Sequence, residues 1–313
     1  MQSLAVAIAS RPVVLDGGLA TLLEAHQHDL SSELWSARLL RENPGAIVAA
    51  HREYFEAGAQ VAISASYQAS FEGFASVGLN RDQAAALLTS SVNLARRARD
   101  EVRPDGWVAA SIGPYGAVLA DGSEYRGDYG LSVAELRAWH RPRLEVLLAA
   151  GADVLALETI PCLAEVEALL TEIAGTGHPA WLSLTCADGR TRAGEPVAEA
   201  FALAAEVPEI IAVGVNCTTP ADVLALLTAA APFRPGLTYP NSGQGWDAVA
   251  RRWTGAASFE PAAVRSWLAA GARLVGGCCR VGPAEITAIA AVVNDDHLQR
   301  AHRGLEDVET LAE

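Results

Sequence analysis

One tripeptide, Ala-Gly-Ala, occurs three times in this chain at the end of a helical segment. The three glycines are Gly58, Gly151 and Gly271, and an apolar, strand-like run follows each of them directly. Glycine can end a helix in a left-handed conformation, and β-branched residues after it favour a strand. A helix that leads straight into a strand is the repeating unit of an α/β fold. This repeat restricts the fold more than any other feature of the sequence.

Eight apolar runs are predicted to be strands, with helical patterns between them. They cover Val13–Asp16, Val61–Ser66, Trp107–Gly113, Val154–Glu158, Ala180–Cys186, Ile210–Cys217, Leu237–Pro240 and Arg273–Cys278. Several are apolar throughout, which is typical of parallel strands covered by helices. Eight such units predict an α/β protein with one domain, a (β/α)8 TIM barrel over residues 1–293. The alternative, a doubly wound open sheet, lacks a GxGxxG motif after the first strand.

Charge and composition exclude several classes of protein. Lys and Arg total 23 and Asp and Glu total 37, which gives a net charge of -14. An acidic surface repels phosphate, so neither nucleic acid nor a membrane surface is expected as a partner. No apolar run approaches the ~18 residues of a spanning helix. Residues 1–10 lack the basic start of a signal peptide, and five cysteines need no disulfide scaffold, so we expect a reduced, cytoplasmic protein.

The C-terminal end of the chain and the oligomeric state are less constrained. Residues 294–313 are polar and acidic and are predicted to form a C-terminal tail, either an appended helix or a partly disordered segment. Nothing in the sequence specifies how many copies of the chain assemble.

Polar residues at the predicted strand ends are few, and such ends carry the active sites of (β/α)8 barrels. Asp16 ends the first strand before Gly17-Gly18, Ser66 ends the second, and Glu158 ends the fourth. Cys217 ends the sixth strand, and Cys278-Cys279 end the eighth. Alternate strands supply side chains to the same interior layers. One carboxylate and two or three thiols are therefore predicted to converge at one level.

Three thiols at strand ends predict a metal site, and thiolates favour zinc over magnesium or calcium. Neighbouring strand residues point to opposite faces, so Cys278 and Cys279 can share a metal only if the strand stops or bulges there. Gly276-Gly277 makes such a break easier. A vicinal disulfide or two packed thiols are the alternatives. Cys162 and Cys186 are predicted to be buried spectators.

Short motifs at these positions resemble those of one family. They are Asp16-Gly-Gly-Leu-Ala20, Ser64-Ala-Ser-Tyr-Gln68, Ser111-Ile-Gly-Pro-Tyr-Gly116, Asp121-Gly-Ser-Glu-Tyr-Arg-Gly-Asp-Tyr129, Leu157-Glu-Thr159, Gly214-Val-Asn-Cys217, Tyr239-Pro-Asn-Ser-Gly243 and Gly276-Gly-Cys-Cys-Arg280. From about Val13 to Ile289 the chain resembles the homocysteine S-methyltransferases, and among them the bacterial type that uses S-methylmethionine. The resemblance implies a barrel, one Zn²⁺ ion on Cys217, Cys278 and Cys279, and homocysteine as methyl acceptor at the fourth zinc position.

Other residues are candidates for holding the two substrates. The ammonium of homocysteine needs an anionic partner, for which Asp16 and Glu158 are the candidates, and its carboxylate could use Asn216 or amides near Gly17 and Gly18. Ser66 is added to this pocket. Carboxylates and aromatic faces attract a sulfonium cation. The candidate donor contacts are Tyr115, Glu124 and Tyr125 in the long connection from Gly113 to Leu131, with Asn241 and Ser242 after the seventh strand.

The resulting hypothesis is transfer of a methyl group from a sulfonium to the zinc-bound thiolate of homocysteine, giving methionine. No side chain acts as acid or base in this step. S-methylmethionine is expected ahead of S-adenosylmethionine as donor, and the sequence does not exclude betaine. The alternatives are selenocysteine or another thiol as acceptor, and a non-enzymatic zinc- or thiol-binding barrel. A hydrolase or lyase that uses zinc-bound water is disfavoured, because three thiolates make bound water a poorer acid.

Overall fold

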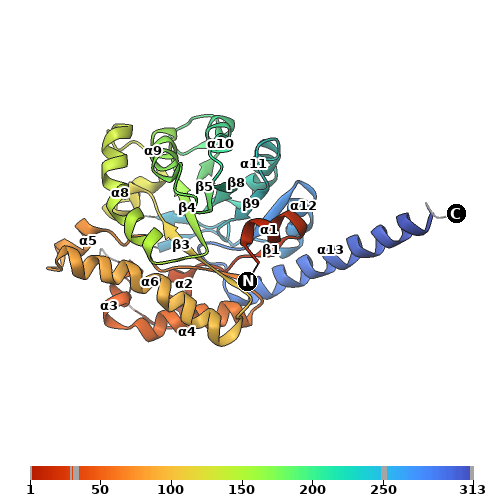
Figure 1. The fold of residues 1–313 in the computed structure, drawn as a ribbon, viewed down its shortest axis with the longest axis horizontal. Helices are drawn as coiled ribbons and strands as arrows, with labels where there is room; N and C mark the ends of the chain where they lie inside the picture. The colour runs from red at the N-terminus through yellow and green to blue at the C-terminus, as the bar shows by residue number, and fades with distance from the viewer. Residues whose placement is uncertain (1, 29, 31–34, 248–251, 311–313) are drawn as a thin grey trace.

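The computed structural model describes residues 2–28, 30, 35–247 and 252–310, and an eight-stranded parallel sheet lies at its centre (Figure 1). The hydrogen-bonded order is β1-β12-β9-β8-β5-β4-β3-β2. Leu15, directly after β1, pairs in parallel with Val61 of β2. The two ends of the sheet therefore meet, and the predicted single-domain α/β barrel is confirmed.

The eight predicted strands all form, most of them with shorter bounds. They are β1 (Val13–Val14), β2 (Val61–Ile63), β3 (Trp107–Ile112), β4 (Val154–Ile160), β5 (Ala180–Leu184), β8 (Ile210–Asn216), β9 (Gly236–Tyr239) and β12 (Ala272–Val275). β2 ends three residues before Ser66, which lies in the following loop. After β12 the amides of Gly277 and Cys278 still donate to Asp16 and Pro240, so this segment stays between its two neighbours.

Helices alternate with the strands and cover the outside of the barrel (Figure 1). The α-helices after the first strand are α2 (Leu19–Ala25), α3 (Leu39–Glu42), α4 (Pro44–Glu56), α5 (Phe71–Ser76), α6 (Arg81–Val102), α7 (Tyr115–Leu119), α8 (Val133–Ala149), α9 (Leu163–Ile173), α10 (Val197–Ala205), α11 (Val223–Ala230), α12 (Val264–Ala269) and α13 (Pro283–Thr310). Capping side chains stand at the start of several of these helices. Asn43 accepts from the Ala46 amide (3.2 Å), and Ser132 and Glu135 form a reciprocal capping box.

Several short helices and hairpins lie within the loops. They are the 3-10 helices η1 (Trp35–Arg38), η2 (Ser123–Tyr125), η3 (Pro220–Asp222) and η4 (Pro261–Ala263), and the hairpins β6 (Cys186–Ala187) with β7 (Arg190–Thr191) and β10 (Gly245–Asp247) with β11 (Arg252–Thr254). Cys186 therefore begins a hairpin strand and does not end a barrel strand. The reason is that its amide donates to Thr218 Oγ1 (3.0 Å), outside the parallel ladder.

The core has two layers, one inside the barrel and one between the barrel and its helices. Helix α1 (Leu4–Ser10) belongs to the inner layer, where Leu4 and Ile8 pack with Val13, Leu15 and other inward-facing strand residues. The Trp107 indole donates to the Gln2 carbonyl (2.9 Å) and ties α1 to the start of β3. The N-terminal end of the barrel is thus closed, so ligands reach the interior from the other end.

Helix α13 runs from Pro283 to Thr310 and crosses the predicted boundary at 293/294 without a break. It extends away from the barrel (Figure 1). The predicted tail is helical as far as residue 310, and residues 311–313 lie outside the described part. A separate role for 294–313 stays a prediction. Among the described helices, none combines the length and the apolar character needed to cross a bilayer.

Candidate metal centre and substrate pocket

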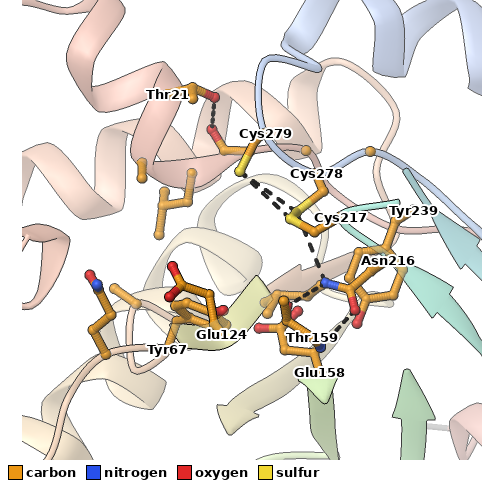
Figure 2. Close-up of a pocket in the computed structure, with 18 of the residues that line it drawn as sticks. Thr21, Tyr67, Glu124, Glu158, Thr159, Asn216, Cys217, Tyr239, Cys278 and Cys279 are labelled. Atoms are coloured by element: carbon orange, nitrogen blue, oxygen red, sulfur yellow. Dashed lines mark hydrogen bonds between the residues drawn. A yellow bond between two sulfur atoms is a disulfide. The ribbon is translucent and has the colours of Figure 1, made fainter. Parts of the chain in front are cut away.

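Three cysteine sulfur atoms meet at the C-terminal end of the barrel (Figure 2). The Sγ of Cys279 lies 3.7 Å from that of Cys217 and 4.0 Å from that of Cys278. Cys217 and Cys278 are joined as a disulfide. The predicted convergence is therefore confirmed, and the vicinal pair Cys278-Cys279 is not the bonded one. Cys162 and Cys186 are buried elsewhere and take no part in the cluster.

Backbone conformation at the strand ends turns these side chains inward. Cys217 has a φ of 45°, a left-handed value that is uncommon outside glycine. This conformation interrupts the alternation of the strand, so Asn216 and Cys217 both line one pocket. After β12 a turn interrupts the strand alternation in the same way, so that Cys278 and Cys279 both face the pocket. In this turn the Val281 amide donates to the Cys278 carbonyl (3.1 Å), and Arg280 has a φ of 62°. The expectation that the strand must stop for both thiols to face one point is confirmed.

Two glycines allow the loops to approach this turn. A Cβ on Gly277 would overlap the Val281 side chain. A Cβ on Gly18 would lie 2.6 Å from the Cys278 carbonyl oxygen. The Asp16-Gly-Gly and Gly-Gly-Cys-Cys motifs therefore pack against each other, and larger side chains would push the thiols out of place.

Once the Cys217–Cys278 disulfide is reduced, the three thiols can hold a tetrahedral metal ion of zinc's size. Zn–S bonds of about 2.3 Å at tetrahedral angles place sulfur atoms about 3.8 Å apart, close to the two separations that Cys279 makes. All three sulfur atoms lie within 4.8 Å of one another. Burial and nearby carboxylates, Glu24 first among them, raise the pKa of the Cys279 thiol to about 12. A thiolate here therefore needs a cation, and the open side of the cluster faces the pocket.

The pocket beside the thiols has a volume of about 130 Å³ and is acidic. Glu124 and Glu158 line it, and none of the described lining residues carries a basic side chain. Its size is comparable to the ~150 Å³ cavity that holds one benzene molecule. This inner pocket suits one small molecule with a positive charge.

Glu158 of β4 is held firmly in the wall of the inner pocket. It is 6% exposed, and it accepts hydrogen bonds from the Ser111 hydroxyl and from Tyr239. The Tyr239 hydroxyl accepts in turn from the Trp181 indole (3.1 Å). Burial raises the pKa of the Glu158 carboxyl to about 7, although these hydrogen bonds and the more distant Arg143 oppose the shift. A cation in the pocket would stabilise the ionised form of the buried Glu158 carboxyl.

Asn216 and Thr159 connect Glu158 to the thiols. The Asn216 amide oxygen accepts from the Thr159 amide (2.7 Å), and its Nδ2 donates to the Thr159 hydroxyl (2.7 Å). The same Nδ2 lies 4.0 Å from Cys278 Sγ, so both of its N–H bonds are in use. Thr159 has a φ of 61° and lines the pocket next to Glu158. Asn216 thus orients its neighbours and offers no free donor to a carboxylate.

The other predicted acceptor contacts are divided between the pocket wall and the layer behind it. Gly17 and Gly18 line the pocket, but the Gly18 amide already donates to Val281 (3.0 Å). Asp16 lies behind them, 1% exposed, and accepts from the Ile63 amide (2.8 Å). Burial raises the pKa of Asp16 well above its usual value. Ser66 also lies behind the wall and donates to the Ser111 carbonyl (2.8 Å).

The predicted donor residues separate in a similar way. Glu124 and Tyr125 line the inner pocket, and burial raises the pKa of Glu124 to about 7. The Oε2 atom of Glu124 has no hydrogen-bond partner among the described residues. Tyr115 does not line the pocket, because its ring packs edge-on against Tyr129 and Trp139.

The two remaining donor candidates, Asn241 and Ser242, lie outside the inner pocket. Asn241 lines a second, outer cavity. Ser242 is buried, and its carbonyl accepts from the Ser258 amide (2.7 Å). It therefore supports the loop that carries Asn241.

Sequence reasoning did not select Tyr67, Thr159 or Tyr239 as site residues, although all three line the inner pocket (Figure 2). Each stands inside a motif that also contains a selected residue or lies beside one. Membership of these motifs is the sequence feature that indicates a site role for the three residues.

Comparison with known sequences assigns the chain to a family. A sequence profile described as Homocysteine S-methyltransferase matches residues 13–293. Homocysteine S-methyltransferase YbgG of Bacillus subtilis is 47% identical over 296 residues, which cover 89% of this chain and 93% of the relative. Homocysteine S-methyltransferase of Escherichia coli is 46% identical over 302 residues, 89% of this chain and 94% of the relative.

Solved structures agree with this assignment. The metallated form of the homocysteine methyltransferase MmuM from Escherichia coli superposes with a TM-score of 0.83 at 44% identity, covering 92% of this chain and 98% of that one. Its oxidised form gives a TM-score of 0.81 at 45% identity, covering 90% and 95%. Both the sequence profile and the full-length relatives show that this chain is a methyltransferase and belongs to the homocysteine S-methyltransferase family.

Proposed function

We propose that the protein transfers a methyl group from a sulfonium donor, S-methylmethionine ahead of S-adenosylmethionine, to homocysteine held on zinc. Cys217, Cys278 and Cys279 are the proposed ligands. The observation that carries the proposal is the thiol cluster, which borders an acidic pocket that no described basic side chain lines. Membership of a methyltransferase family leaves no support for the alternative of a non-enzymatic barrel.

Each end of homocysteine has a proposed partner in the inner pocket. When bound, zinc supplies the acceptor sulfur as a thiolate at neutral pH. Glu158 receives the ammonium. The first turn of α2, residues 19–21, lines the same pocket and is the proposed neighbour of the carboxylate. These contacts replace Asn216, whose donors are already engaged.

The transfer needs orientation more than proton chemistry. A new C–S bond forms to the acceptor sulfur as the donor C–S bond breaks, and that electron pair stays on the donor sulfur. The donor therefore leaves as a neutral thioether, and no proton moves. Holding sulfur and methyl carbon about 3–3.5 Å apart supplies much of the rate enhancement. Because the donor loses its positive charge in this step, Glu124 serves to select and bind a cation and does not accelerate the transfer.

Donor choice is the direct test of this function. With S-methylmethionine, S-adenosylmethionine and betaine at equal concentration, S-methylmethionine is expected to be consumed fastest. Glu124→Gln should raise KM for S-methylmethionine about ten-fold at pH 8, since a neutral amide attracts the sulfonium less. The KM for homocysteine should not change in that variant, which serves as the internal control. Betaine as the best donor, or an unchanged donor KM, would contradict the proposal.

The ammonium site is expected to depend on pH through Glu158. Its carboxyl titrates near pH 7 because it is buried, so it is neutral below that pH and ionised above it. Methionine, the product, carries the same ammonium and has no thiol to ionise. Its affinity for the inner pocket should rise as pH increases from 6 to 8 and then level off. Because the pKa of Glu124 in the same pocket is also raised to about 7, calorimetric titration is made on the Glu124→Gln variant, and the further change Glu158→Gln should abolish the dependence that remains. An affinity that falls over this range in Glu124→Gln would refute the assignment.

A further inference from the structure

A second cavity of about 450 Å³ adjoins the inner pocket at the same end of the barrel. Tyr125 and Trp253 line both, so they form the partition between the two. The inner pocket, at about 130 Å³, has room for one small amino acid only. A reaction between two such molecules therefore needs the outer cavity for the rest of the second one.

The outer cavity differs from the inner pocket in carrying basic side chains, Arg126 and Arg192. Arg126 is already paired with Asp121 (3.6 Å) and Asp128 (3.4 Å). Arg192 forms no ion pair with any carboxylate in the described part of the chain. Its Nε donates to the Thr185 hydroxyl (3.3 Å), and its guanidinium carbon lies 5.4 Å from the centre of the Tyr125 ring. These contacts fix Arg192 while leaving its terminal amino groups for a ligand.

Two carboxylates besides that of Asp121 line the same cavity without an ion pair to Arg192, and of these Asp188 is exposed to solvent whereas Asp222 is not. Asp222 precedes α11, is half-buried, and its side chain makes no capping hydrogen bond. Burial raises the pKa of the Cys186 thiol in the cavity wall to about 12; the charge of Arg192 opposes this shift, and the charge of Asp222 adds to it. No ion pair joins Asp222 to Arg192 or to another described basic residue. Unpaired charges of opposite sign therefore line one cavity.

We propose that the outer cavity binds the zwitterionic amino acid end of the methyl donor, with its carboxylate on Arg192 and its ammonium on Asp222. This inference rests on the proposed function. The sulfonium end then passes Tyr125 and reaches Glu124 in the inner pocket. S-methylmethionine has both ends, whereas trimethylsulfonium has only the sulfonium. After transfer from S-methylmethionine, each cavity holds one molecule of methionine.

Donor kinetics test the outer site. Arg192→Gln should raise KM for S-methylmethionine by about ten- to a hundred-fold, the usual loss for a charge-assisted hydrogen bond. The KM of trimethylsulfonium as donor, or its inhibition constant if it is a poor donor, should stay the same, as should KM for homocysteine. Arg190→Gln is the matched control, because Arg190 lies on the same hairpin and does not line the cavity. Asp222→Asn should behave as Arg192→Gln does.

Methionine binding gives a second measurement that does not depend on turnover. Titration calorimetry of the zinc form should find two methionine molecules per chain, and one in Arg192→Gln. Glu158→Gln should lose the other one. An Arg192→Gln variant that keeps two sites, or that weakens trimethylsulfonium and S-methylmethionine equally, would overturn the outer site. If the unaltered protein does not use S-methylmethionine at all, the proposed donor is wrong instead, so the two failures are distinguishable.

Discussion

Cys279→Ser is expected to release the metal and to lower the rate of methyl transfer by more than ~100-fold. Loss of a residue that only supports a metal ligand lowers activity by up to about 100-fold, and loss of a ligand itself should have a larger effect. A serine hydroxyl is far harder to ionise than a thiol, so two thiolates would remain to hold the ion. Cys217→Ser and Cys278→Ser should have the same effect. The measurement is metal content per chain and initial rate after reduction, zinc loading and dialysis. Reduction comes first because Cys217 and Cys278 are joined as a disulfide, which offers no thiolate.

Two other cysteines provide matched controls for this experiment. Cys162 precedes α9 and Cys186 begins β6; both are buried and neither belongs to the thiol cluster. Cys162→Ser and Cys186→Ser should keep one zinc per chain and an unchanged KM for homocysteine. Full activity in Cys278→Ser or Cys279→Ser would refute the metal centre. Loss of zinc in Cys186→Ser would show that the ligand set is a different one.

Glu158→Gln should weaken homocysteine binding by about 1.5–3 kcal/mol, or roughly ten- to 150-fold, because a charge-assisted hydrogen bond to the ammonium is lost. The amide can still accept from Ser111, so the wall of the pocket should keep its shape. Zinc content should not change, since Glu158 makes no direct hydrogen bond to any of the three cysteines and reaches Cys278 only through Thr159 and Asn216. Substrate KM values and metal content, measured on the same preparation, check both points.

Glu124→Gln is the complementary control for this variant. Both carboxylates line the inner pocket, and burial raises the pKa of each to about 7. Glu158→Gln should alter KM for homocysteine, and Glu124→Gln should alter KM for the donor. If Glu158→Gln instead binds homocysteine normally or loses its zinc, Glu158 does not anchor the ammonium.

The sequence by itself predicted the barrel and the thiol cluster. Helix and strand periods are local properties, and three Ala-Gly-Ala joins and eight apolar runs fix the order of the elements. In a closed parallel barrel that order places every strand end at one rim. Cys217, Cys278 and Cys279 therefore had to meet near one another once the fold was known, and Cys162, in a loop, did not.

Which neighbours of these thiols face a ligand depends on packing in three dimensions. Asp16 and Glu158 look alike in the sequence, yet Asp16 accepts from the Ile63 amide behind the wall while Glu158 lines the pocket. Left-handed residues such as Thr159 and Cys217 break the two-residue period that a prediction relies on.

The sequence did not predict the outer cavity either. It forms where Tyr125 of η2 meets Arg192, beyond β7, and Trp253 of β11, and no pattern within any one of these segments encodes their contact. Pocket walls are built by side chains far apart in the chain, and their packing depends on all three dimensions of the fold. For that reason the sequence determined where the chemistry lies, and the folded structure determined which charges face each substrate.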